Sequence, residues 1–205
     1  MGSGHAVMLF CKETRQCLFE PTKTGTRTAQ NFLRSVGWVY LAPDHGYPDD
    51  YLAKYPNLAN YKAYCFLRNP IERFVSTVLF LKQQSLCAVR FKEVIDESGV
   101  VATVETLSYD QFVDHINQFK AKFPIMLEAQ SRWMTLPGTE VLDFDNYESE
   151  IRRISGDYNS PLGVMNKTTD FGKSVVTQKV IDFVRQEYAA DYALAKDRLG
   201  KEYNP

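Results

Sequence analysis

The segment CLFEPTKTGTRTAQNFL, residues 17–33, constrains the fold more than any other part of the chain. It passes from an apolar, strand-like stretch into a polar turn that contains Lys23 and Gly25, and then into a helical pattern expected over 26–36. The amino terminus of a helix offers unpaired N–H donors and about half a positive charge. A strand, a glycine-containing turn and a helix in this order therefore predict a site for a phosphate-like anion.

A second segment repeats this arrangement. FLRNPIERFVSTVLF, residues 66–80, ends a strand expected at 63–67 and opens a helix at Pro70, where the missing N–H of proline costs nothing. Arg68 stands at the end of the strand, and Ser76 follows about two helical turns later. Arginine presents a planar fork that matches phosphate oxygens, and serine adds a hydroxyl. Two anion sites at successive strand ends fit a nucleotide that carries phosphates in two places.

The rest of the chain continues the alternation of strands and helices, which predicts an α/β fold with a mainly parallel central sheet flanked by helices, in a single domain over 1–205. Residues 1–7 are expected to be disordered or a remnant of an expression tag, 43–60 an irregular surface segment, and 84–107 an insertion or an edge hairpin. Further strands are expected at 38–42 and 140–144, and a short helix at 147–154. A capping box of Ser108 and Gln111 predicts the start of another helix, and a long carboxy-terminal helix is expected over a stretch that includes 180–192.

Composition limits the partners of such a site. The 205 residues carry a formal net charge of -1, which provides no overall attraction to nucleic acid or to an anionic membrane, so neither partner is expected. No apolar run reaches the roughly 18–20 residues of a membrane span. The four cysteines are scattered without a CxxC pair, which favours reduced thiols and a cytoplasmic location. Nothing in the sequence predicts an oligomeric state.

The loop differs from the common ATP- and GTP-binding loop. That loop has the form G-x-x-x-x-G-K-[ST], with glycine directly before lysine, whereas Gly25 follows Lys23 by two positions here. The difference weakens the hypothesis of a kinase-like phosphotransferase without removing it. A nucleotide-binding module without catalysis also stays open at this point.

Both motifs resemble those of the sulfotransferases. PTKTGTRT (21–28) is similar to their 5′-phosphosulfate loop, P-K-[TS]-G-[TS]-[TS], and RNPIERFVS (68–76) resembles their 3′-phosphate motif, R-[DN]-P-x-x-R-[FL]-x-S. The chain departs from the loop pattern at Thr22, which is an extra residue, and at Arg27, where a small hydroxyl residue is usual. Weaker similarity to the carbohydrate (heparan and chondroitin) branch extends over EAQSRWM (128–134), VLDFDNYESEIRRI (141–154), NKT (166–168) and EYAADYAL (187–194).

The resemblance implies a three-layer P-loop-type fold and the donor 3′-phosphoadenosine 5′-phosphosulfate (PAPS). A sulfuryl group would pass from PAPS to an acceptor hydroxyl on a carbohydrate or small metabolite, without a metal ion. Lys23 would neutralise charge at the bridging oxygen, the N–H groups of 24–28 with the hydroxyls of Thr26 and Thr28 would hold the 5′-phosphate, and Arg68 with Ser76 would bind the 3′-phosphate. The implied donor-binding residues are Thr22, Lys23, Thr24, Gly25, Thr26, Arg27, Thr28, Arg68 and Ser76.

An acceptor hydroxyl also needs a general base, for which histidine is the usual choice near neutral pH. His45 follows the strand expected at 38–42, so we expect it at the same sheet edge as both phosphate motifs. The resemblance implies a catalytic His or Glu in this region, whereas a lone loop histidine is otherwise a solvated surface residue. Asp44, Asp49 and Asp50 are the alternatives, although aspartate in a loop more often caps a turn.

Three further residues are expected to have structural roles. His115 shares an apolar helical face and is expected to be packed or half-buried. Arg73 is expected on a solvated helix face, and Trp133 in the core rather than in a ligand pocket.

Overall fold

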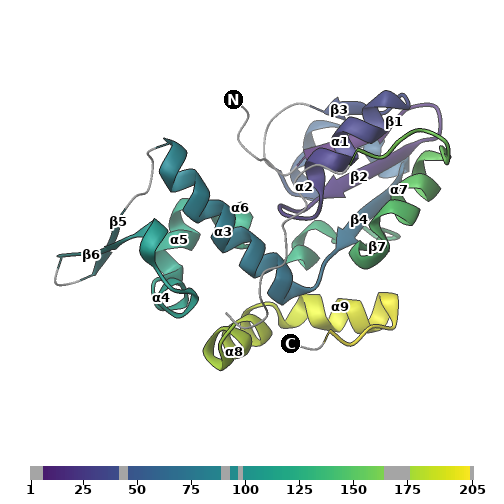
Figure 1. Ribbon diagram of the computed structural model, residues 1–205. Coiled ribbons are helices and arrows are strands. Elements are labelled where there is room, and N and C mark those ends of the chain that lie inside the picture. Colours follow the sequence, from purple (N-terminus) through teal and green to yellow (C-terminus); the bar gives the residue numbers. More distant parts are fainter. Residues whose placement is uncertain (1–6, 42–45, 89–92, 97–98, 164–175, 204–205) are drawn as a thin grey trace.

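A five-stranded sheet forms one half of the molecule and a group of helices forms the other (Figure 1). The computed structural model describes residues 7–41, 46–88, 93–96, 99–163 and 176–203. The order of the strands in the sheet is β3-β1-β2-β4-β7. These strands are β1 (Val7–Cys11), β2 (Gln16–Glu20), β3 (Val39–Leu41), β4 (Lys62–Leu67) and β7 (Glu140–Asp143).

The strands that carry the site are parallel, but the sheet as a whole is mixed. β2 pairs with β4, and β4 with β7, in parallel, whereas β1 is antiparallel to both β2 and β3. The prediction of a mainly parallel sheet is therefore corrected at β1, which begins at Val7 inside the stretch expected to be disordered. A short turn with Arg15 at φ 51° joins β1 to β2, and a connection this short can join only antiparallel neighbours.

Helices cover both faces of the sheet, because successive residues of a buried strand point to opposite sides. Leu18 of β2 packs with side chains of α1 (Thr26–Ser35) and α7 (Tyr147–Ser155). Phe19 packs on the other face with side chains of α2 (Pro48–Lys54) and the 3-10 turn η1 (Pro56–Asn60). The expectation of an irregular segment over 43–60 was therefore wrong from Pro48 onward. Proline at the first turn and the Asp50 carboxylate, which accepts from the N–H of Tyr47, start α2.

The helical half is built around α3 (Pro70–Ala88), which begins after β4 and runs away from the sheet (Figure 1). Ser108 and Gln111 form the expected capping box at the start of α4. Within 84–107, β5 (Glu93–Asp96) and β6 (Gly99–Thr103) form a separate hairpin rather than an edge of the main sheet, followed by η2 (Val104–Thr106). Apolar side chains of α3 share a second core with α4 (Tyr109–Asp114), α5 (Ile116–Lys122), α6 (Pro124–Leu127) and α8 (Gln178–Glu187).

Two helices that the apolar periodicity predicts as continuous are each divided. The first is interrupted at His115, between α4 and α5, and the carboxy-terminal one at Tyr188, between α8 and α9 (Ala189–Leu199). Tyr188 has a φ of -110°, and its buried hydroxyl donates to the carbonyl oxygen of Leu127 at 3.0 Å. The break lets α8 pack in the helical core while α9 lies against β7. Periodicity could not reveal it, because the apolar spacing continues across the junction.

The described cysteine side chains are reduced. Cys11, Cys17 and Cys65 are free and buried, and burial raises the pKa of the Cys17 thiol to about 12, which keeps it unreactive at neutral pH. Among the helices in the described ranges, none is long and apolar enough to cross a membrane.

Candidate anion-binding site

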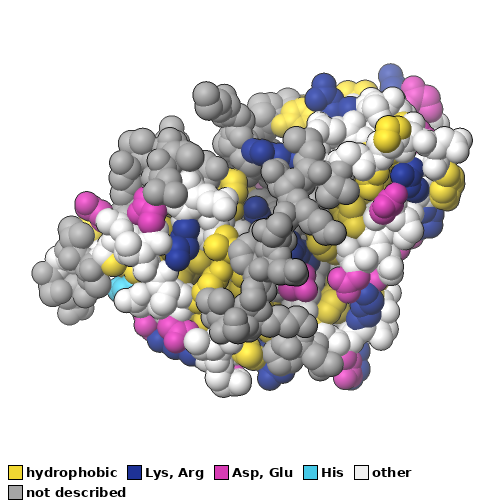
Figure 2. Space-filling view, viewed as in Figure 1, with side chains coloured by type: hydrophobic (Ala, Val, Ile, Leu, Met, Phe, Trp, Pro, Cys, Tyr) yellow, Lys and Arg dark blue, Asp and Glu magenta, His cyan; other side chains and the backbone are white. Residues whose placement is uncertain are grey.

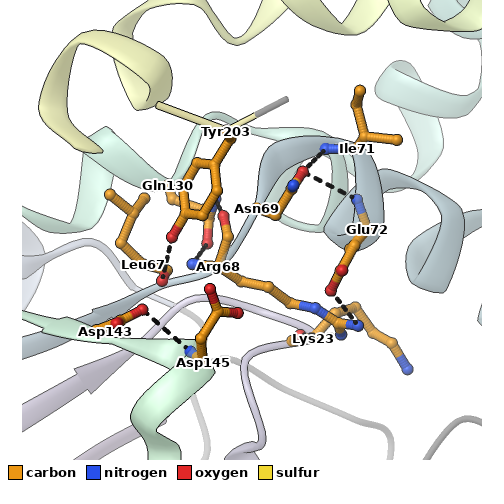
Figure 3. Close-up of polar contacts among 10 residues, drawn as sticks. All are labelled: Lys23, Leu67, Arg68, Asn69, Ile71, Glu72, Gln130, Asp143, Asp145 and Tyr203. Carbon is orange, nitrogen blue, oxygen red and sulfur yellow. Dashed lines mark hydrogen bonds and ion pairs between the residues drawn. The ribbon is translucent and has the colours of Figure 1, made fainter. Parts of the chain in front are cut away.

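The two predicted phosphate motifs lie side by side at the carboxyl ends of adjacent parallel strands. β2 leads into the loop at 21–25, and β4, paired with it in parallel, leads into Arg68 and α3. The guanidinium of Arg68 donates from Nη1 to the carbonyl oxygen of Lys23 at 3.1 Å (Figure 3). Residues that are 45 positions apart in the sequence are therefore in direct contact. Crevices at the carboxyl ends of parallel strands are where open α/β sheets bind their ligands.

Backbone conformation shapes the loop. Lys23 has a φ of 67°, which is uncommon for a residue with a side chain, and Gly25 has a φ of 81° at the N-cap of α1. The hydroxyl of Thr24 donates to the carbonyl oxygen of Pro21 at 2.6 Å and closes the turn. A Cβ atom on Gly25 would lie 2.6 Å from the ring of Tyr147, whose hydroxyl donates to the Gly25 carbonyl oxygen at 2.9 Å. Gly25 is required both by its φ and by the approach of Tyr147.

The first turn of α1 supplies fewer donors than the sequence predicts. The N–H of Thr28 donates to the carbonyl oxygen of Gly25 at 2.9 Å, so it already has a partner within the helix. The N–H groups of Thr26 and Arg27 precede the first intrahelical hydrogen bonds and point out of the helix end. The hydroxyl oxygen of Thr26 is buried without a hydrogen-bond partner among the described residues. A bound anion is the kind of group that would satisfy these donors.

Lys23 is the cation at the centre of the site. Burial, and then the neighbouring charges of Arg68 and Arg27, lower the pKa of its ammonium group to about 8. Its Nζ atom lies 4.5 Å from the centroid of the Phe80 ring on α3. Arg27 itself is exposed, so the residue that departs from the sulfotransferase pattern lies at the solvent side of the site. Three cations this close repel one another, and a bound anion would relieve that repulsion.

Arg68 presents its fork beside the loop. Its side chain is 14% exposed, and its Nη2 atom lies 3.4 Å from the carboxylate of Glu72 one helical turn later. The Nε atom is buried without a hydrogen-bond partner among the described residues. Asn69 caps α3 with its side-chain oxygen, which accepts from the N–H of Ile71 at 2.9 Å (Figure 3). Arg68 therefore has donor capacity left for a ligand at the amino end of α3.

Arg73 differs from its prediction and clamps the loop from α3. It is 2% exposed rather than solvated, and its Nε donates to the carbonyl oxygen of Thr22 at 3.1 Å. Its Nη2 reaches the Thr22 hydroxyl at 3.5 Å and the carbonyl oxygen of Met126 at 3.3 Å. Ser76, predicted to bind the 3′-phosphate, is buried and lies on the same helical face, between Arg73 and Phe80. The signal in the sequence was the spacing: Arg73 stands three residues before Ser76, which places it on the helical face that was predicted to meet the ligand.

Glu20, at the end of β2 directly before the loop, was not among the predicted site residues. Its side chain is fully buried, and both carboxylate oxygens are without a hydrogen-bond partner among the described residues. Burial raises the pKa of Glu20 well above its ordinary value of 4.5. The raised pKa favours the neutral carboxyl group, which adds no negative charge beneath the cationic loop. A charged residue that ends an otherwise apolar strand was the signal in the sequence.

The structure does not test His45 as the general base. His45 and the alternative Asp44 lie outside the described residues. Asp49 and Asp50 are exposed on α2, where Asp50 caps the helix and Asp49 lies 3.4 Å from Arg132, so both have structural partners.

The other two structural expectations were confirmed. Trp133 is 1% exposed in the core, and His115 is half-buried. Within the ranges that the structure describes, no group of three or more His, Cys, Asp or Glu side chains is placed to hold a metal ion.

The site lies between the two halves of the molecule. Figure 2 shows lysine and arginine side chains inside the hollow between the sheet half and the helical half. Comparison with known proteins adds nothing to this geometry: no family model matches the chain, and no match was found among curated proteins or solved structures.

Proposed function

We propose that the protein is a sulfotransferase that transfers a sulfuryl group from PAPS to an acceptor hydroxyl on a carbohydrate or small metabolite. The observation that carries the proposal is the direct contact of the two motifs, in which the Arg68 guanidinium meets the Lys23 carbonyl oxygen. Two anion-binding elements in contact fit one nucleotide with phosphates at both its 5′ and 3′ ends. ATP and GTP have only one phosphate chain, so they leave the second element without a ligand.

Lys23 is the residue on which catalysis depends in this proposal. Departure of the sulfuryl group leaves negative charge on the bridging oxygen of the nucleotide, and a nearby ammonium group stabilises that charge. The pKa of about 8 leaves Lys23 protonated at pH 7, as this role requires. The N–H groups of Thr26 and Arg27 would hold the 5′-phosphate, and Arg68 with Ser76 the 3′-phosphate. His45 stays our candidate for the base that removes the proton of the acceptor hydroxyl.

Calorimetric titration tests the donor assignment directly. We expect tight binding of adenosine 3′,5′-bisphosphate, the product of PAPS, and much weaker binding of ADP and AMP, with no requirement for Mg²⁺. Arg68→Ala should weaken bisphosphate binding by on the order of 30-fold, since a hydrogen bond to a charged group contributes about 2 kcal/mol. The same substitution should leave AMP binding nearly unchanged.

Controls separate the two motifs from general effects. Arg153→Ala removes an exposed arginine of α7 that pairs with Glu140 and Glu150, and it should alter neither affinity. Lys23→Ala should abolish sulfuryl transfer, and His45→Ala should lower turnover while leaving bisphosphate binding intact. A preference for ADP, or a dependence on Mg²⁺, would instead indicate a phosphotransferase and overturn the proposal.

A further inference from the structure

One side chain fixes the backbone of Arg68 on both sides of its Cα atom. Gln130, fully buried at the start of the 3-10 turn η3 (Gln130–Trp133), donates from Nε2 to the carbonyl oxygen of Arg68 at 2.8 Å. Its Oε1 accepts from the N–H of Arg68 at 3.0 Å (Figure 3). β4 ends at Leu67, so the side-chain amide of Gln130 provides the hydrogen bonds to the first backbone groups after the strand.

A buried carboxylate from the carboxy-terminal helix in turn holds Gln130. Asp191 of α9 is fully buried, and its Oδ2 accepts from the Gln130 N–H at 2.9 Å and from Gln130 Nε2 at 3.3 Å. Its Oδ1 accepts from the N–H of Ser131 at 2.7 Å. Because a buried carboxylate without partners is strongly destabilising, these three donors fix the position of Asp191 and of Gln130 together. A continuous set of hydrogen bonds therefore runs from α9 to Arg68.

The carboxy-terminal segment also supports the residue before Arg68. The hydroxyl of Tyr203 donates to the carbonyl oxygen of Leu67 at 3.4 Å (Figure 3). Lys201 lies near the carboxylates of Asp143, at 2.5 Å, and Asp145, at 2.9 Å, at the end of β7. These contacts attach the segment after α9 to the ends of two strands beside the site. The direction in which the Arg68 fork leaves the backbone is thus set by residues far away in the sequence.

We propose that Gln130 and Asp191 are positioning residues that make the site specific for a 3′-phosphorylated nucleotide. They act through the backbone of Arg68, whose guanidinium must be oriented in advance to bind a phosphate in a defined place. The inference rests on the proposed function, because it takes the Arg68 fork as the ligand of the 3′-phosphate. A merely structural role of the pair would weaken the binding of every nucleotide alike, whereas positioning affects only nucleotides with a 3′-phosphate.

The test compares adenosine 3′,5′-bisphosphate with adenosine 5′-monophosphate, which lacks the 3′-phosphate. Gln130→Met keeps the length of the side chain and removes both hydrogen bonds to Arg68, and Asp191→Asn replaces one acceptor with a donor. Each variant should bind the bisphosphate about tenfold more weakly and the monophosphate within about twofold of the wild-type affinity. Asp197→Asn is the matched control, because Asp197 lies exposed on the same helix, and it should change neither affinity.

Hydrogen exchange of the Arg68 amide, followed by NMR, gives a readout that needs no ligand. Exchange should accelerate in Gln130→Met and in Asp191→Asn and stay unchanged in Asp197→Asn. Unchanged exchange in the first two variants, or an equal loss of affinity for both nucleotides, would overturn the inference. Equal affinity of the wild-type protein for the two nucleotides would overturn the proposed function instead, and the exchange result would then decide whether Gln130 and Asp191 hold Arg68.

Discussion

The loop at 21–28 and the Arg68 element at 68–76 are both proposed to bind a phosphate but are shaped in different ways. The turn of the loop is formed by its own residues, through the positive φ of Lys23 and Gly25 and the Thr24 hydrogen bond to Pro21, and Arg73 and Tyr147 hold it from outside. Arg68 takes its orientation from Gln130. On the proposed function, a loop whose turn is formed locally would bind the phosphate common to all the nucleotides, whereas discrimination between them would depend on the distant segments that hold Arg68.

Damage to the two elements should therefore have different consequences. Substitutions that distort the loop should weaken every nucleotide, because all of them carry a 5′-phosphate. Substitutions around Arg68 should weaken only those with a 3′-phosphate. Arg73 connects the two elements, because its backbone belongs to α3 and its guanidinium donates to Thr22 of the loop. Its replacement is expected to have the largest effect on stability and on nucleotide binding.

Arg73→Met should destabilise the protein by about 3 kcal/mol, because it removes the donor to the buried carbonyl oxygen of Thr22 and to the partly buried carbonyl oxygen of Met126. Loss of this clamp should also abolish binding of the bisphosphate and of AMP together. Chemical denaturation and calorimetry measure the two effects. Arg153→Met, on the surface of α7, serves as the control and should cost less than about 1 kcal/mol. If the variant lost affinity for the bisphosphate but kept its affinity for AMP, Arg73 would act on the 3′-phosphate as Arg68 does. The proposed difference between the loop and the Arg68 element would then be wrong.

Gly25→Ala should cost roughly 2 to 4 kcal/mol in unfolding free energy, because a positive φ and a clash with Tyr147 act at the same residue. Gly37→Ala is the matched control. Gly37 has a φ of 92°, but a Cβ atom there meets nothing within 4 Å, so only the backbone term of about 1 kcal/mol is expected. Thermal unfolding and nucleotide titration of both variants give the comparison. Equal costs would show that contact with Tyr147 does not shape the loop.

Nucleotide affinity should fall as the pH rises through about 8, where Lys23 loses its proton in the free protein. A bound phosphate favours the charged ammonium, so binding above this pH requires proton uptake and weakens by up to about tenfold per pH unit. Titrations at pH 7, 8 and 9 measure the slope, and Lys23→Arg, which stays charged, should flatten it. Because the pKa of Lys23 is lower in the folded protein than its ordinary value of 10.5, the free protein should gain stability as the pH rises from about 8 to about 10.5.

Glu20→Gln is expected to have the smallest effect on binding, within about twofold at pH 7, because the raised pKa of Glu20 favours the protonated carboxyl group, which resembles the amide. Stability should respond in a defined direction. The folded pKa lies above the unfolded value, so the wild-type protein loses stability as the pH rises above about 4.5, and the glutamine variant does not. Unfolding curves at pH 4 and pH 8 should therefore coincide at the lower pH and favour Glu20→Gln at the higher. Weaker anion binding in wild type than in Glu20→Gln at pH 7 would mean that Glu20 is ionised.

The amino-acid sequence by itself determined the local elements of the site. Periodicity and turn residues predicted β2, α1, β4 and the start of α3 within about one residue, as well as the capping box of α4, because each depends on residues close in the chain. The expectation that both motifs lie at one edge of the sheet was also confirmed, since β2 and β4 are parallel neighbours whose carboxyl ends lie together. The antiparallel β1 and the break at Tyr188 were missed, because both are set by pairing and packing with other segments.

Only the tertiary structure decided how the site is held. Arg73 reads as an exposed helix residue until the loop is packed against α3, and Asp191 reads as an ordinary polar position until α9 meets η3. The physical reason is that a buried charge or amide is tolerated only when its hydrogen-bond partners are supplied, and here the partners come from segments roughly 50 to 60 residues away. Local sequence specifies the strand, turn and helix of the loop, and long-range packing fixes the side chains around it.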